Sequence, residues 1–460
     1  MRPIARLAFA FRGGFGRVTP DPFVLAIALT LGVMVTGIVF RPETGVAALE
    51  STLTDWSGSA GLWKLLAFGM QASLMLVLGT AVADAPPIRR RIEGLAATAA
   101  SPRRLVGLVA FCAIALGLLN WSLALIGGAL LARSAGAHAA KQGWKLDYPL
   151  LAAAGYSGLM VWHGGLSGTA PLKATTEKDL VEVLGPELAA KVGTLSLEQT
   201  LLGDLNLFVS GGLLLLGPLL FMAMVPSQGE GNHRAYVGDA LDPEPTAPNP
   251  EPSDTLERIE TSPWVLRALA LPMALALFVF VFRKGLGRVG LDTVNLTLWV
   301  MAMALHGRPD RFVSACERGI RGATGIFIQF PLYAGIMGMM SGAGLSKALA
   351  QTVSDAGAAV LAPLTFASAA LINLFVPSGG GQWAVQGPII MDAALRTGVE
   401  PATILMAMAY GDQLTNMLQP FWALPLLAIT GCKAREIVGY CVIFMLAGAA
   451  WMAAGLVLFG

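Results

Sequence analysis

The sequence predicts an all-α polytopic membrane protein with inverted repeats, and three observations support this fold class. Hydrophobic residues make up 55% of the 460 residues and charged residues only 13%, with a mean hydropathy of +0.65. Soluble domains carry about 25% charged residues, so this composition excludes an ordinary cytosolic enzyme and a disordered scaffold. The second observation is a series of apolar stretches long enough to span a bilayer. The third is an internal duplication.

Nine apolar stretches approach the roughly 20 residues that a helix needs to cross the bilayer core. They cover residues 22–40, 62–83, 148–172, 200–225, 264–282, 291–306, 320–340, 400–430 and 434–459. Two further segments, 105–133 and 357–391, each contain two apolar arms that we predict to be too short to cross. The arms meet at Asn120 and at the glycine run after Ser378. We therefore expect two re-entrant hairpins, because non-helical backbone at membrane depth must be buried in protein or line a cavity.

Basic residues predict the orientation of the spans. With a cytoplasmic N-terminus, the segments that fall inside hold 18 of the 31 Lys and Arg residues, as the positive-inside rule requires. The C-terminus is then expected outside. The span at 264–282 is the exception, because Arg283, Lys284 and Arg288 would follow it on the outer side. No long basic run with interleaved aromatic residues suggests a nucleic-acid partner, and no CxxC pair suggests a metal site.

Residues 226–262 form the one soluble-looking stretch. They contain eight acidic residues, and five prolines lie within 243–252. This composition predicts a flexible, solvated linker on the cytoplasmic side, with a regulatory tail as the alternative. The linker divides the chain into a first repeat at 1–225, with four spans and the cytoplasm-facing hairpin, and a second repeat at 263–460, with five spans and the outside-facing hairpin.

The internal duplication relates matching residues at nearly one offset. Three pairs are separated by 253, 254 and 258 residues: Asn120 and Asn373, Tyr156 and Tyr410, and Gln71 and Gln329. The extra span at 264–282 inverts the second half, so the two hairpins are expected to open from opposite sides. Inverted repeats whose broken helices meet at the bilayer midplane are typical of secondary transporters.

The predicted substrate site lies at the two hairpin tips and at two helix breaks, which we expect at residues 163–169 and at residues 411–416 with the following Gln419-Pro420. Free N–H groups at a helix N-terminus suit a carboxylate, and glycine lets a ligand approach the backbone. The expected substrate-binding residues are Asn120, Ser122, Ser167, Thr169, Asn373, Ser378, Gly379, Gly380 and Gly381. Close packing between membrane helices is the alternative use of such small residues.

Asp412 is the most informative single residue, because an acid within a membrane segment is costly and usually functional. We expect Asp412, Thr415, Asn416 and His163 to form the site of a coupling ion, either Na⁺ or a proton. A structurally paired acid and a simply hydrogen-bonded histidine are the alternatives. Four tryptophans next to the breaks either pack there or wall an apolar pocket: Trp121, Trp162, Trp383 and Trp422.

The motifs PSGGGQW and QPFWALP, together with the runs LLAFGMQASLML and TVNLTLWVMAMALHG, resemble the bacterial short-chain fatty acid transporter family of the ion transporter superfamily. The resemblance extends over nearly the whole chain. It implies an elevator-type carrier in the bacterial inner (cytoplasmic) membrane, in which hairpins and broken helices slide against a scaffold. It also implies a homodimer. Glycine is common in that family where this chain has His163, and glutamate where it has Asp412.

We therefore expect a secondary active transporter, not an enzyme, that takes up short-chain fatty acids and related monocarboxylates such as butyrate and acetoacetate. Its partners are then the carboxylate substrate and the lipid bilayer. We expect no cofactor, with H⁺ or Na⁺ as the coupling ion. The breaks contain no arginine to clamp a second carboxylate, which favours a monoanion over the alternative, a Na⁺-coupled dicarboxylate carrier. An intramembrane hydrolase using Ser167 and His163 is a remote alternative, since the glycines between them disfavour a regular helix.

Overall fold

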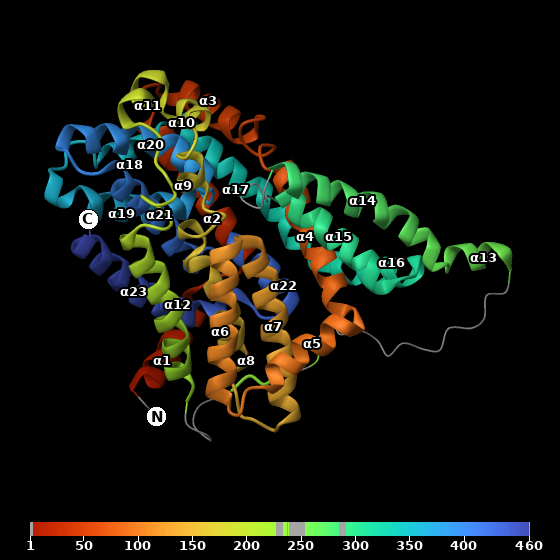
Figure 1. The fold of residues 1–460 in the computed structure, drawn as a ribbon. Coiled ribbons are helices and arrows are strands. Elements are labelled where there is room, and N and C mark those ends of the chain that lie inside the picture. The colour runs from red at the N-terminus through yellow and green to blue at the C-terminus, as the bar shows by residue number, and fades with distance from the viewer. Residues whose placement is uncertain (1–2, 227–232, 237, 239–253, 285–290, 460) are drawn as a thin grey trace.

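The computed structural model describes residues 3–226, 233–236, 238, 254–284 and 291–459, and the regular secondary structure in these ranges is helical. Most of the predicted linker at 226–262 lies outside the described residues. Nine helices of the described part are long and apolar enough to cross a membrane. The all-α polytopic class is therefore confirmed (Figure 1).

The unbroken spans lie close to their predicted bounds. They are α2 (Pro22–Phe40), α4 (Leu66–Asp84), α12 (Asp204–Met224), α14 (Pro263–Lys284), α17 (Thr324–Gly342) and α23 (Ala434–Phe459). The helix at the remaining predicted span, α15 (Leu291–His306), has 16 residues and is not among the nine. Helix α14 packs against α15 and α16 (Pro309–Arg321), yet Leu271 and Phe282 on it are 74% and 82% exposed. Such exposure is unfavourable in water but suits lipid, so α14 has the surface of a lipid-facing span.

Both predicted helix breaks are present, but the second starts later than expected, because Gly411 to Thr415, Asp412 included, continue the helix that precedes it. The first break follows α8 (Tyr148–Tyr156) and contains the short 3-10 helices η1 (Ser157–Met160) and η2 (Trp162–Gly164) before α9 (Thr169–Lys173). The second lies between α21 (Pro401–Thr415) and α22 (Pro420–Thr430), with η4 (Asn416–Leu418) inside it. Gln419 adopts φ −84° and ψ 116°, because a residue before proline is driven out of the helical region.

The two hairpins consist of α6 (Pro102–Leu119) with α7 (Trp121–Lys141), and of α19 (Ala358–Phe375) with α20 (Gly379–Thr397). The prediction that their arms are too short to cross is wrong, since the four helices have 18 to 21 residues. Three of them, α6, α7 and α20, extend past the predicted bounds through polar turns that hydropathy does not register, whereas α19 lies within them. In Figure 1 the hairpins open toward different sides, α6–α7 beside α5 (Pro86–Ala97) and α19–α20 beside α18 (Leu345–Gln351).

Further helices occupy segments that the sequence analysis left as connections. Besides α5, α16 and α18, they are α1 (Pro3–Val18), α3 (Gly45–Ser57), α10 (Glu177–Leu184), α11 (Pro186–Val192) and α13 (Thr255–Glu260). Local signals explain some of them. Thr176 accepts a hydrogen bond from the backbone N–H of Asp179 and caps α10, and Gly185 turns the chain into α11 with φ 77°, a conformation that glycine adopts without strain.

A buried carboxylate connects α1, the linker and α23. Asp147 is fully buried, accepts hydrogen bonds from Tyr440 Oη at 2.8 Å and Arg234 N at 2.9 Å, and lies 3.2 Å from Arg12 Nη1. Arg234 also pairs with Glu436 at the start of α23. The described linker residues 233–236 are thereby attached to both halves of the chain.

Replacing Asp147 with alanine is expected to lower the free energy of unfolding by about 3 kcal/mol, because it leaves buried donors without their acceptor. Thermal unfolding of the purified protein in detergent measures the effect. Glu182→Ala is the control, since Glu182 forms an exposed pair with Lys173 that contributes little. Equal transition temperatures for the two variants would contradict the assignment of Asp147 as a stabilising contact.

Candidate functional site

The two helix breaks contact each other near the centre of the molecule. The backbone N–H groups of His163 and Gly164 donate to Gln413 Oε1 at 3.0 and 3.1 Å. In the other direction, Tyr156 Oη donates to the carbonyl of Asn416 at 2.7 Å. Residues about 250 positions apart in the sequence thus satisfy the polar backbone that each break exposes.

The backbone donors of the first hairpin tip have partners in the tip itself and in the first break. Asn120 Oδ1 accepts hydrogen bonds from the N–H groups of Ser122 and Leu123 at 2.9 and 3.3 Å. Ser167, from the first break, accepts from the N–H of Trp121 at 3.0 Å. The first three N–H groups of α7 therefore have protein partners and are not open to a ligand.

The second tip differs from the first. Ser378 Oγ caps α20 by accepting from the N–H of Gly381 at 3.2 Å. The N–H groups of Gly379 and Gly380 have no hydrogen-bond partner among the described residues. They stand at the positive end of a 19-residue helix, where anions bind favourably. The second tip therefore offers two open donors.

The two glycines that carry these donors line a cavity of about 200 Å³. Ser378, Gly379 and Gly380 line it from the second tip, with Thr169 of α9 and Asn416 of the second break. Trp162 also lines it, and its indole N–H is buried without a hydrogen-bond partner in the described chain. None of the described lining residues is ionisable.

The opposite wall of the cavity is aromatic. Phe68 of α4, Trp121 of α7 and Trp422 of α22 line it and contact one another, with ring centroids 5.2 to 6.2 Å apart. Phe421 and Leu159 complete this surface. The cavity thus has a polar end at the second tip and an apolar end between three helices.

The structure divides the predicted substrate-binding residues into two groups. Thr169, Ser378, Gly379 and Gly380 line the cavity. The others hold the tips in place and do not line the cavity in the described structure: Asn120, Ser122, Ser167, Asn373 and Gly381.

Asn373 shows what this second group does. Its amide nitrogen lies 2.6 Å from the Asp412 carbonyl and 3.0 Å from both Thr415 Oγ1 and Asn416 Oδ1. Thr415 in turn donates to the carbonyl of Ala370 at 2.9 Å. The second tip and the second break are therefore tied together by polar contacts.

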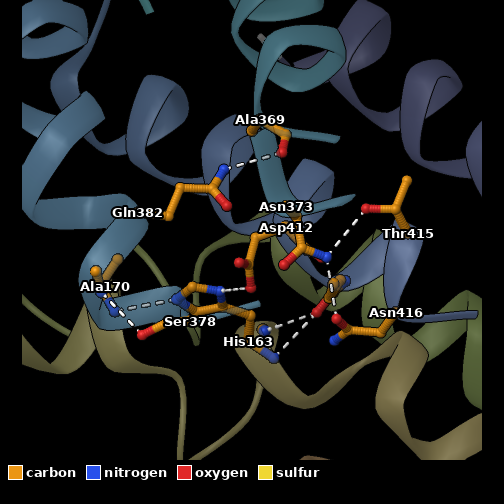
Figure 2. Close-up of polar contacts among 12 residues, drawn as sticks. His163, Ala170, Ala369, Asn373, Ser378, Gln382, Asp412, Thr415 and Asn416 are labelled. Atoms are coloured by element: carbon orange, nitrogen blue, oxygen red, sulfur yellow. Dashed lines mark hydrogen bonds and ion pairs between the residues drawn. The ribbon is translucent and has the colours of Figure 1, made fainter. Parts of the chain in front are cut away.

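The four predicted coupling residues lie together. His163 and Asp412 are 0% and 1% exposed, and His163 Nδ1 lies 2.7 Å from Asp412 Oδ2. Ala170 N donates to the other ring nitrogen, Nε2, at 3.1 Å. Figure 2 shows the imidazole between the Asp412 carboxylate and Ala170, with Thr415 and Asn416 around Asn373 beside it.

Comparisons with known proteins agree on one family. The family model described as "Short chain fatty acid transporter" matches residues 4–459. A candidate short-chain fatty acid transporter of Escherichia coli (strain K12) is 34% identical over 447 residues, which cover 96% of this chain and 97% of that protein. The chain belongs to the short-chain fatty acid transporter family. A second candidate transporter, from Haemophilus influenzae, is 33% identical over 92% of both chains.

Two solved structures resemble this chain over most of its length. MtrF of Neisseria gonorrhoeae, reported with a class of antimetabolite efflux pumps, has a TM-score of 0.40 and 16% identity and covers 98% of this chain and 96% of its own. The YdaH transporter of Alcanivorax borkumensis, reported to have an unusual topology, also has a TM-score of 0.40 and 16% identity. The match covers 96% of this chain and 99% of that one.

The family assignment makes the chain a membrane transporter and not an enzyme. The geometry of this family member agrees, because Ser167 and His163 do not form the nucleophile–base pair that a hydrolase needs. Ser167 Oγ accepts from Trp121 N, while both nitrogens of His163 are engaged by Asp412 and Ala170.

Several site residues of this transporter were missed from the sequence. Gln413 joins the two breaks, and Asn206 of α12 donates to the carbonyl of Gly164 at 2.8 Å while accepting from Tyr410 Oη at 3.1 Å. Asn206 could have been identified from the sequence, because it is an isolated asparagine in the apolar stretch at 200–225. Phe68 and Phe421 had no such signal, since aromatic residues are common throughout membrane spans. Trp383, which the sequence placed beside the second tip, is fully buried away from the cavity.

Proposed function

We propose that this family member is a secondary active transporter that takes up short-chain monocarboxylates of the butyrate and acetoacetate type, coupled to H⁺ or Na⁺. One observation carries the proposal. Gly379 and Gly380, whose N–H groups at the start of α20 have no partner among the described residues, line a small uncharged cavity with an aromatic wall.

The polar end of the cavity suits one carboxylate. Two backbone N–H groups and the positive end of α20 favour an anion, and the Trp162 indole N–H supplies a third donor. Ser378 can add its hydroxyl hydrogen, because its oxygen already accepts from Gly381 N. Hydrogen bonds of this kind to a charged group are stronger than those between neutral groups.

The apolar end suits a short aliphatic chain. A cavity of about 200 Å³ is smaller than the roughly 300–1,000 Å³ of sites for drug-sized ligands. A dicarboxylate would place its second charge against Phe68, Trp121 and Trp422, where the described lining residues offer no cation. Burying an unpaired charge is costly, so the alternative dicarboxylate substrate is disfavoured.

Alternating access is supported by two hairpins that open toward different sides (Figure 1). We propose an elevator motion in which these hairpins and the broken helices move against the remaining spans, within a homodimer in the inner membrane. The start of α23 packs against α1, and α23 is 26 residues long. A cytoplasmic N-terminus would therefore place the C-terminus on the outer side.

Reconstituted protein provides the test. Proteoliposomes loaded with unlabelled butyrate are expected to accumulate labelled butyrate by saturable counterflow, above the passive diffusion measured in protein-free vesicles. Labelled succinate is the comparison substrate. Saturable succinate counterflow without butyrate counterflow would overturn the substrate assignment. Imposed proton and Na⁺ gradients in the same vesicles test the coupling.

Trp162→Phe is expected to raise the KM for butyrate about tenfold, because it removes an N–H donor to a carboxylate and keeps an aromatic ring. Trp383→Phe is the matched control, since its buried indole N–H also lacks a partner but lies away from the cavity. Initial rates of counterflow over a butyrate concentration series measure both. An unchanged KM in the Trp162 variant would remove this donor from the site.

A further inference from the structure

The protonation of His163 is determined by a single backbone N–H. Ala170 N donates to Nε2 at 3.1 Å, and an amide N–H cannot accept, so Nε2 must hold a lone pair. The hydrogen of the neutral imidazole is then on Nδ1, which donates to Asp412 Oδ2 at 2.7 Å. A doubly protonated ring would direct a second N–H at the N–H of Ala170. His163 is therefore neutral and does not compensate a charge on Asp412.

The other groups facing Asp412 are also uncharged. Asn373 of α19 donates to its carbonyl, and Gln413 beside it on α21 binds the backbone of the first break. Tyr410, two residues earlier, donates to Asn206 on α12. Within the described residues, no lysine or arginine forms an ion pair with Asp412 or lines the cavity.

One oxygen of Asp412 is left without a partner. Oδ1 is buried and accepts no hydrogen bond within the described part of the chain. A proton on Oδ1 would neutralise a carboxylate that is otherwise costly at this depth. Na⁺ would need several further oxygens, but the Asp412 carbonyl, Thr415 Oγ1 and Asn416 Oδ1 already surround the amide nitrogen of Asn373.

Asp412 also lies directly behind the proposed carboxylate site. A Cβ atom built on Gly379 would lie 2.9 Å from His163 Cε1, so a single imidazole separates the Asp412 carboxylate from the backbone of the second tip. Two negative charges on either side of a neutral ring repel each other. A proton on Asp412 removes this repulsion, and such coupling is reciprocal.

We propose that Asp412 takes up one proton on Oδ1 when a monocarboxylate binds at the second tip, so that anion and proton occupy the site together as a neutral pair. The side chain of Asp412 gains one O–H bond with a proton from solvent, and no bond of the substrate changes. His163 is a positioning residue that holds Oδ2 by its Nδ1 hydrogen. This inference rests on the proposed function, because it requires a monocarboxylate at Gly379 and Gly380.

Calorimetry of butyrate binding to the purified full chain tests the proposal. Titrations near pH 7 in buffers of different ionisation enthalpy, with choline in place of Na⁺, give the number of protons taken up. We expect about one proton per butyrate, and a Kd that rises by up to about tenfold per pH unit. Binding without proton uptake, or binding that requires Na⁺, would overturn the proton site alone. No butyrate binding at any pH would overturn the proposed function itself.

Three variants locate the proton. Asp412→Asn mimics the protonated carboxyl, so it is expected to bind butyrate without proton uptake and with a pH-independent Kd. Asp392→Asn makes the same chemical change at an exposed, arginine-paired acid of α20 and should keep the uptake. His163→Gln should also keep it. Loss of proton uptake in the His163 variant together with its retention in Asp412→Asn would assign the proton to the histidine and overturn the proposal.

Discussion

Gly379→Ala is expected to reduce kcat/KM for butyrate by about a hundredfold. The added Cβ would lie 2.8 Å from Trp162 Cη2 and 2.9 Å from His163 Cε1. These two rings are buried and stacked with centroids 4.4 Å apart, so they cannot move aside. The N-terminus of α20 must shift instead, and a displacement of about 1 Å at a binding site can cost about a hundredfold in rate.

Gly380→Ala is the control for this experiment. Its added Cβ would come no closer than 3.3 Å, to the methyl group of Thr169, and a side-chain methyl can yield by a few tenths of an ångström. We expect a change of only a few-fold, measured as initial counterflow rates in the same vesicles. Equal rates for Gly379→Ala and the wild-type protein would show that the second tip does not bind the substrate closely.

Gly128→Ala is expected to lower the free energy of unfolding by at least about 3 kcal/mol. Its added Cβ would lie 2.0 Å from the carbonyl oxygen of Gly155, where α7 and α8 touch backbone to backbone. Overpacking of a core costs about 1–3 kcal/mol when side chains can adjust, and here two helices must separate. Apparent unfolding temperatures in detergent, recorded at one scan rate, measure the effect.

Gly127→Ala is the matched control on the same helix. Its added Cβ would meet the Leu116 Cδ1 atom at 2.7 Å, which is the end of a flexible side chain. The higher helix propensity of alanine offsets part of this contact. We therefore expect little change in stability, and a Gly128 variant as stable as the Gly127 variant would contradict the close approach of α7 and α8.

Much of the fold could be predicted because it depends on local properties of the chain. The unbroken spans follow from apolar length, and the breaks follow from Gly164, Gly165 and the Gln419–Pro420 step, where the backbone cannot continue a helix. The lengths of the hairpin arms could not be predicted in this way. Their ends are polar turns that apolar length does not register, and they are marked instead by local caps such as Ser101 before α6 and Gly398 after α20.

The site was predicted as a set of residues, but their roles were not. Asn120 and Ser378 look equivalent as polar residues at two hairpin tips. The structure gives the first tip a full set of acceptors, including Ser167 from 46 residues away, and leaves Gly379 and Gly380 open at the second. This asymmetry depends on which segment packs against which tip, and the repeat pattern contains no such information.

The sequence by itself determined the membrane class, the breaks, the tips and the presence of an acid and a histidine near them. Hydropathy and backbone stiffness act over a few residues, so they can be read along the chain. Only the tertiary structure decided that His163 donates to Asp412 across 249 positions, and that the resulting pair lies behind the open N–H groups of the second tip. Hydrogen bonds require atoms within about 3 Å, and that proximity exists only once both repeats have packed together.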